Sequence, residues 1–175
     1  MSTQFQFKEL NGVSGSQVET AMINLNFGAV DAPNLAVTSY PIAAGTNSYA
    51  KYFIAFWSGD FTQISNVRAW LPSGSYVTGE LIAFSGSMEY TSPINTLTGD
   101  PSIPTSWPAT PNVSIPWWKY PGFNPYAGSS TIGVIAGSGA TSGSSQIMRI
   151  QLQTTSATPG GAVHQKTFAI TYDQI

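Results

Sequence analysis

Glycine and proline interrupt this chain so often that few stretches of it could form an amphipathic helix. The 175 residues include 17 Gly and 12 Pro. Few windows hold apolar residues at the i, i+3, i+4 and i+7 spacing of a helix without one of these two residues inside. The stretches between them alternate instead between apolar and polar residues, which is the period of a strand with one buried face. The pattern predicts an all-β chain.

These stretches predict about eight strands. Residues 49–57 (YAKYFIAFW) are apolar on both faces, which is typical of a central strand. Residues 64–71 and 76–84 are predicted to form a hairpin across Pro72-Ser73-Gly74. The other predicted strands cover residues 5–7, 21–27, 35–40, 147–154 and 168–172.

Strands that follow one another through turns, without helices between them, predict antiparallel sheets. The expected architecture is a two-sheet β-sandwich with either jelly-roll or immunoglobulin-like topology. Residues 1–175 are expected to form a single domain with its own core. Residues 1–16 form a possible N-terminal arm, and residues 85–145 form a long Pro/Gly-rich loop insertion.

Charged residues are scarce. Only 8% of residues are Asp, Glu, Lys or Arg, against roughly 25% in an ordinary soluble domain. Six scattered Lys and Arg residues form no basic stripe for phosphate groups, so no nucleic-acid partner is expected. We expect no membrane span, because no apolar stretch approaches the required length, and no signal peptide, because MSTQFQFKEL has no basic region followed by an apolar run. A neutral surface suits packing against neighbouring subunits, although it could also carry no functional meaning.

The residues needed for catalysis and metal binding are few. The chain has no cysteine, and its single histidine is His164, so a nucleophile with a base and an orienting acid is not expected. Asp60 and Asp100 each follow a glycine, which indicates turns more than calcium ligands. Glu80 and Glu89 could pair as the acids of a glycosidase, but Glu80 is more simply an ordinary strand residue. The prediction is a non-enzyme without metal or cofactor.

The aromatic residues fall into two groups. Trp57 and Trp70 lie inside predicted strands and are expected in the core. The second group lies among prolines, which hold a chain extended and help it to present rings to a partner. The same rings could fold back and cap one end of the domain, or could form a platform for a sugar. The candidate partner-binding residues are Trp107, Trp117, Trp118, Tyr120, Phe123 and Tyr126.

Several segments resemble virion structural proteins of tailed bacteriophages. The longest is KYFIAFWSGDFTQISNVRAWL at residues 51–71, in which an aromatic strand precedes an Ile-Ser-Asn-Val-Arg-x-Trp strand. IPTS at residues 103–106 follows in order. Near the C-terminus, the resemblance continues in LQTT at 152–155, ATPG at 157–160 and FAITYD at 168–173. It covers residues 51 to 175 in patches, and residues 117–126 depart from it.

The resemblance implies a head decoration or auxiliary capsid protein without enzymatic activity. Such a protein forms homo-oligomers, contacts other virion proteins such as the major capsid protein, and resides in the virion after assembly in the host cytoplasm. Two alternatives remain open. One is a carbohydrate-binding module that uses Trp117, Trp118 and Tyr120 as stacking platforms, and the other is a filament or surface-layer subunit.

Overall fold

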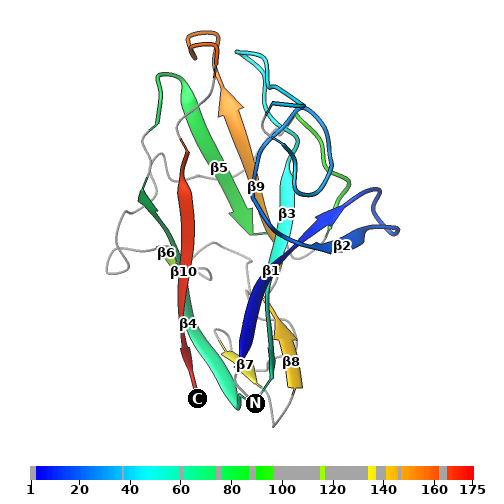
Figure 1. Cartoon of the computed structure of the whole chain (residues 1–175), viewed down its shortest axis with the longest axis vertical. Coiled ribbons are helices and arrows are strands. Elements are labelled where there is room, and N and C mark those ends of the chain that lie inside the picture. Colours follow the sequence, from blue (N-terminus) through cyan, green and yellow to red (C-terminus); the bar gives the residue numbers. More distant parts are fainter. Residues whose placement is uncertain are drawn as a thin grey trace.

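The fold is built from antiparallel strands (Figure 1). The computed structural model describes residues 3–36, 38–59, 61–73, 76–86, 90–96, 115–116, 134–136, 141–145, 147–161 and 165–175. Within these ranges there is no helix, and every pair of neighbouring strands is antiparallel. The all-β and antiparallel predictions are therefore confirmed for this part of the chain.

The larger sheet has six strands, of which five follow the order β2-β1-β3-β9-β5, while β8 also pairs with β3. Strands β9 and β8 share one edge of β3, with β9 opposite residues 51–53 and β8 opposite residues 56–59. The six strands are β1 (Gln4–Asn11), β2 (Val18–Ala21), β3 (Lys51–Gly59), β5 (Glu80–Gly86), β8 (Thr141–Ser144) and β9 (Met148–Thr154).

Ser145 lies between these two neighbours of β3. Its backbone N–H donates to the carbonyl of Ala55 at 2.8 Å, and its Oγ accepts from the Ala55 N–H at 3.0 Å. The serine side chain thus supplies an acceptor where a regular ladder would use a carbonyl. Ser145 is buried, so this pairing is shielded from water.

The smaller sheet has four strands in the order β10-β4-β6, with β7 also pairing with β4. Strand β10 runs along β4 for most of its length, and the short β6 and β7 pair with different parts of β4. The strands are β4 (Gln63–Ser73), β6 (Ile115–Pro116), β7 (Val134–Ala136) and β10 (Thr167–Gln174).

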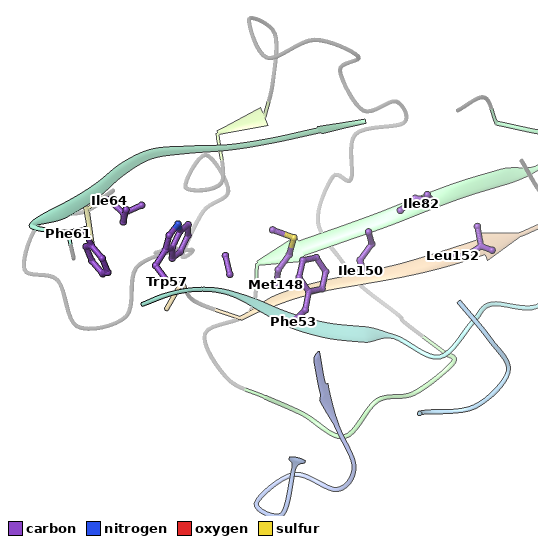
Figure 2. Packing of buried hydrophobic residues seen from close by; sticks show 9 residues of the cluster. Phe53, Trp57, Phe61, Ile64, Ile82, Met148, Ile150 and Leu152 are labelled. Carbon is purple, nitrogen blue, oxygen red and sulfur yellow. The ribbon is translucent and has the colours of Figure 1, made fainter. Parts of the chain in front are cut away.

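Both sheets contribute to one hydrophobic core (Figure 2). Phe168 of β10 packs 5.7 Å from the Phe7 ring of β1, and Tyr172 of β10 packs 5.4 Å from Trp57 of β3. Partly buried Phe168, Ile170 and Tyr172 lie against the buried cluster. Its buried members are Phe53, Ala55, Trp57, Phe61, Ile64, Ile82, Met148, Ile150 and Leu152.

Strand β3 is buried on its other face as well. Tyr52 and Ile54 point away from the main core and join a second cluster with Leu10, Ala50 and Tyr90. The segment 90–96 covers this cluster, because the Tyr90 ring packs 5.0 Å from Tyr52 and the Ala50 N–H donates to the Ile94 carbonyl at 3.0 Å. The prediction of a central strand at residues 49–57 is therefore confirmed, with β3 beginning at Lys51.

The predicted strands at residues 21–27 and 35–40 are wrong. Strand β2 ends at Ala21, and neither residues 22–36 nor residues 38–40 contain a strand. Asparagine side chains replace the ladder here, since Asn34 Oδ1 accepts from the Ile23 N–H at 2.7 Å and Asn26 Nδ2 donates to the Leu35 carbonyl at 2.7 Å. Asparagine competes with regular structure by such local bonds. Met22, Leu25 and Phe27 of this loop still pack against the core, whereas Ile23 is exposed, so burial here does not follow the alternation of the sequence.

The predicted hairpin between residues 64–71 and 76–84 is also wrong. Strand β4 pairs with β10, whereas β5 pairs with β9 in the other sheet. Ile64 of β4 and Ile82 of β5 lie in the same core and reach it from different sheets. Alternation shows which face of a strand is buried, but it does not show which strand is the partner.

Strands also form within the predicted N-terminal arm and within the predicted loop insertion. The possible arm at residues 1–16 contains β1, which is hydrogen-bonded to β2 on one side and to β3 on the other. The predicted insertion at 85–145 contains β6, β7 and β8, together with the segment 90–96. Residues 147–154 and 168–172 form β9 and β10, as predicted.

Replacing Phe53 by alanine should lower the free energy of unfolding by about 3–5 kcal/mol, since a fully buried aromatic ring is removed from the core. Urea denaturation measures the change. Ile23→Ala is the matched control, because Ile23 is 85% exposed and its truncation should change the free energy by about 0.5 kcal/mol or less. Equal losses in the two variants would contradict the core assignment.

Candidate functional site

The aromatic residues predicted to bind a partner lie outside the described residues. These are Trp107, Trp117, Trp118, Tyr120, Phe123 and Tyr126. His164, Glu89, Asp60 and Asp100 also lie outside. Trp57 is fully buried in the core, as predicted, and Trp70 lies in β4, although the position of its side chain is outside the described part.

Within the described ranges, no three His, Cys, Asp or Glu side chains gather in a way that could hold a metal ion. The same ranges contain no helix that is long and apolar enough to cross a membrane. The chemically distinctive features of the described chain are two buried ion pairs.

The first ion pair lies where the apolar inner face of the larger sheet turns polar. Strand pairing sets Phe7 opposite Ala55 and Glu9 opposite Phe53, so Glu9 continues the row of Phe5 and Phe7 that faces the core. On β3, Lys51 continues the row of Phe53, Ala55 and Trp57 in the same way. The two charged side chains therefore meet on the buried face.

Lys51 and Glu9 are almost completely buried, with side chains 1% and 0% exposed. Lys51 Nζ lies 2.6 Å from Glu9 Oε1 and donates a second bond to the Ala32 carbonyl at 2.6 Å. Glu9 Oε2 accepts from the Asn34 N–H at 3.4 Å. The loop that follows β2 thus covers the ion pair and supplies part of its hydrogen bonding.

Asn11 extends the cluster to a second carboxylate. Its Nδ2 donates to Glu9 Oε1 at 3.0 Å and to Asp31 Oδ1 at 2.7 Å. Because both neighbours can only accept, the amide nitrogen must point toward them. The buried Asn11 Oδ1 then has no hydrogen-bond partner in the structure, while Asp31 Oδ2 also accepts from the Gly12 N–H at 2.7 Å.

We call Glu9, Asn11, Asp31 and Lys51 the polar cluster. It brings together an amine, a carboxamide and two carboxylates, of which Glu9, Asn11 and Lys51 are buried and Asp31 is partly buried. Removing one partner of such a buried pair leaves the other charge uncompensated, at a typical cost of about 3–5 kcal/mol. The cluster therefore ties the loop after β2 firmly to the sheet.

The second ion pair joins Glu80, the first residue of β5, to Lys166. Lys166, just before β10, lies 2.6 Å from Glu80 Oε1, and Glu80 Oε2 accepts from the Val77 N–H at 2.9 Å. Both carboxylate oxygens of Glu80 are thus occupied, and its side chain is 1% exposed. This arrangement gives Glu80 a structural role at the start of β5 and leaves it inaccessible to a sugar substrate.

Tyr76 lies beside this second pair. Lys166 Nζ is 4.9 Å from the centre of the Tyr76 ring. Burial, and then the negative charge of Glu80, raise the pKa of Tyr76 to about 12. Its buried hydroxyl has no hydrogen-bond partner in the described structure.

A second tyrosine holds the turn between β1 and β2. The Tyr90 hydroxyl donates to the Gly12 carbonyl at 2.6 Å. Burial raises the pKa of Tyr90, and the nearby charge of Asp31 adds to this effect. Ser14 reinforces the contact, since its Oγ donates to the Tyr90 carbonyl at 3.2 Å.

The polar cluster was not among the sites predicted from the sequence. A signal was available, because Lys51 interrupts the apolar run YAKYFIAFW and Glu9 follows Phe5 and Phe7 at spacing two. A charged residue on a predicted buried face requires a partner. The sequence alone could not select Glu9 as that partner, since 42 residues separate it from Lys51.

Comparisons of the chain with protein-family models, with curated proteins and with solved structures found no match.

Replacing Tyr76 by phenylalanine should flatten the loss of stability in alkali. A tyrosine in the unfolded chain ionises near pH 10, whereas Tyr76 in the folded chain does so near pH 12. Between these values the unfolded state releases a proton that the folded state keeps, so the stability of the wild type falls as pH rises. Tyr76→Phe lacks this contribution.

Urea midpoints of both proteins, measured from neutral pH to about pH 12, test this expectation. Near neutral pH the two midpoints should be similar, because the lost hydroxyl has no hydrogen-bond partner in the described structure. The gap should open above pH 10 in favour of the variant. Parallel curves throughout would show that Tyr76 does not couple folding to pH.

Proposed function

We propose that this chain is a non-enzymatic virion structural protein, most specifically a capsid decoration or auxiliary protein that cements neighbouring subunits. The resemblance to virion proteins of tailed phages motivates the proposal. The structural observation that supports it is that two ion pairs are buried inside the protein. The chain has only six basic and eight acidic residues, and the two ion pairs place two of each inside.

This placement leaves the outer surface even poorer in charge than the composition suggests. A third pair, Lys8 with Glu19 at 3.3 Å, brings opposite charges together on the outside of the β1–β2 hairpin. A surface with few charges desolvates at low cost when it packs against a neighbour, because buried unpaired charges are the groups most expensive to cover. Such a surface suits a permanent lattice contact better than free diffusion.

The arrangement of the two sheets supports a β-sandwich. Rings of β10 contact rings of β1 and β3 at centroid distances of 5.4–5.8 Å, so the sheets share one aromatic core. Face-to-face packing of antiparallel sheets is the architecture of jelly-roll and immunoglobulin-like domains. Either topology would give a rigid body with loops at its ends.

In this proposal the proline-rich aromatic segment supplies the adhesive contacts. Trp117, Trp118 and Tyr120 would bury their rings against a second copy of the chain or against the major capsid protein. Tryptophan and tyrosine dominate the energy of many interfaces, because each removes a large apolar area from water with few rotatable bonds. The protein would then reside in the virion, after assembly in the host cytoplasm.

A double variant, Trp117→Ala with Trp118→Ala, should weaken self-association and binding to shells of the major capsid protein by tenfold or more. Truncating a tryptophan that acts as a hot spot of an interface costs about 2 kcal/mol or more, which is more than tenfold in affinity. Light scattering and co-sedimentation with the shells measure the change. Tyr40→Ala, at an exposed aromatic residue in another part of the sequence, is the control and should bind like the wild type.

The urea midpoint separates binding from folding. It should stay unchanged in the double variant if the rings face a partner, and it should fall if they cap the domain from within. A wild-type chain that stays monomeric and ignores the shells would overturn the proposal. A tryptophan fluorescence response to glycans would favour a carbohydrate-binding module instead, and ordered fibres or sheets in negative-stain images would favour a filament or surface-layer subunit.

A further inference from the structure

The polar cluster holds the reactants of an internal amide bond. Lys51 supplies a primary amine, Asn11 supplies a carboxamide, and Glu9 supplies a carboxylate that contacts both. All three side chains lie in the buried part of the molecule. We propose that Lys51 and Asn11 join in an intramolecular isopeptide bond, with Glu9 carrying the protons. This inference is independent of the proposed virion role.

Strand register brings the two reacting side chains together. Leu10 lies opposite Tyr52 in the β1–β3 ladder, so Asn11 comes opposite Lys51 on the same face of the sheet. Lys51 Nζ and Asn11 Nδ2 also bond to the same atom, Glu9 Oε1, at 2.6 and 3.0 Å. Two groups fixed in this way react as if at very high concentration, because the entropy of bringing them together has already been lost on folding.

Glu9 lies where it can take a proton from Lys51, because its Oε1 is 2.6 Å from the Lys51 Nζ. A buried charge pair can relax by moving the proton from the ammonium to the carboxylate, which leaves two neutral groups in a medium of low polarity. A desolvated lysine with a nearby base is a recognised nucleophile. The Ala32 carbonyl, 2.6 Å from Nζ, holds the amine within the cluster.

The reaction balances without an added oxidant or cofactor. Glu9 takes a proton from the Lys51 ammonium, and the freed Nζ lone pair attacks Cγ of Asn11. The carbonyl electrons move to Oδ1 and return as the Cγ–Nδ2 bond breaks. Glu9 delivers the first proton to Nδ2, which leaves as ammonia, and then takes the second proton from Nζ; passing that proton on gives ammonium and restores the Glu9 carboxylate. One C–N bond forms and one breaks.

The unpaired oxygen of Asn11 fits this role. Its Oδ1 is buried and has no hydrogen-bond partner in the described structure, so the carboxamide is held only through its nitrogen. Both bonds from Nδ2 go to carboxylates, and Glu9 and Asp31 are thus placed around the group that must leave. A purely structural asparagine in a buried site would ordinarily satisfy its oxygen as well.

Intact-mass measurement of the purified full chain tests the proposal directly. The wild type should be lighter than its sequence by about 17 Da, the mass of the ammonia that nucleophilic attack by the lysine expels. Glu9→Gln, Asn11→Ala and Lys51→Arg should each restore the full mass. Lys51→Arg is the most informative of these variants, because arginine keeps the positive charge beside Glu9 but does not act as the amine nucleophile.

Lys8→Arg is the matched control. Lys8 forms an ion pair with Glu19 on the outside of the sheet, so its replacement should keep the mass loss. Circular dichroism of each variant shows whether it folds, and the mass comparison is made only among folded proteins. A loss of mass that persists in both Lys51→Arg and Asn11→Ala would overturn the proposal.

Trypsin digestion gives a second readout. The chain has no Lys or Arg between Lys8 and Lys51, and the next one is Arg68. An acylated Lys51 resists cleavage, so the cross-linked chain should give one peptide of residues 9–68 with the mass deficit inside it. An ordinary ion pair would give separate peptides 9–51 and 52–68. A folded wild type of full mass that is cleaved after Lys51, even after prolonged incubation, would also overturn the inference.

Discussion

The structure depends on covering β3 on both faces. One face carries Phe53, Ala55 and Trp57 into the core shared with the smaller sheet, and the other carries Tyr52 and Ile54 under the segment 90–96. Both sets of contacts remove large apolar areas from water, which is the dominant favourable contribution to folding. Strands β1, β9 and β8 complete the edges of β3, so most of the larger sheet is organised around this one strand.

The two buried ion pairs mark where this core ends. Glu9 with Lys51, and Glu80 with Lys166, each join a sheet residue to a partner that helps to hold a loop or a neighbouring strand in place. Such pairs give little net stabilisation compared with apolar residues of equal size, but they penalise any arrangement that leaves one charge unpaired. The two buried ion pairs therefore favour the native arrangement of the strands over arrangements that would separate their charges.

The alternation of apolar and polar residues predicted several strands of this fold. It could not predict which strands, distant in the sequence, pair with one another. The apolar run at 49–57 and the alternation at 147–154 and 168–172 indicated strands because their side chains reveal buried faces. The hairpin between β4 and β5 failed because both strands bury a face in the same core from different sheets. The strands predicted at residues 21–27 and 35–40 were wrong because asparagine side chains form the hydrogen bonds that a neighbouring strand would otherwise make. Glu9 could not be identified as the partner of Lys51 without knowledge of the β1–β3 register.

Ser145 pairs with the part of the β3 edge that lies between the segments bound by β8 and β9. By bonding both backbone groups of Ala55, it fixes the alignment of the chain just before β9 begins. These two hydrogen bonds fix the register of β9 with β3. The length of the chain before β8 therefore does not have to fix that register. Insertions or deletions before β8 should therefore leave the core alignment intact, so the chain can vary in that region while the same sheet is preserved.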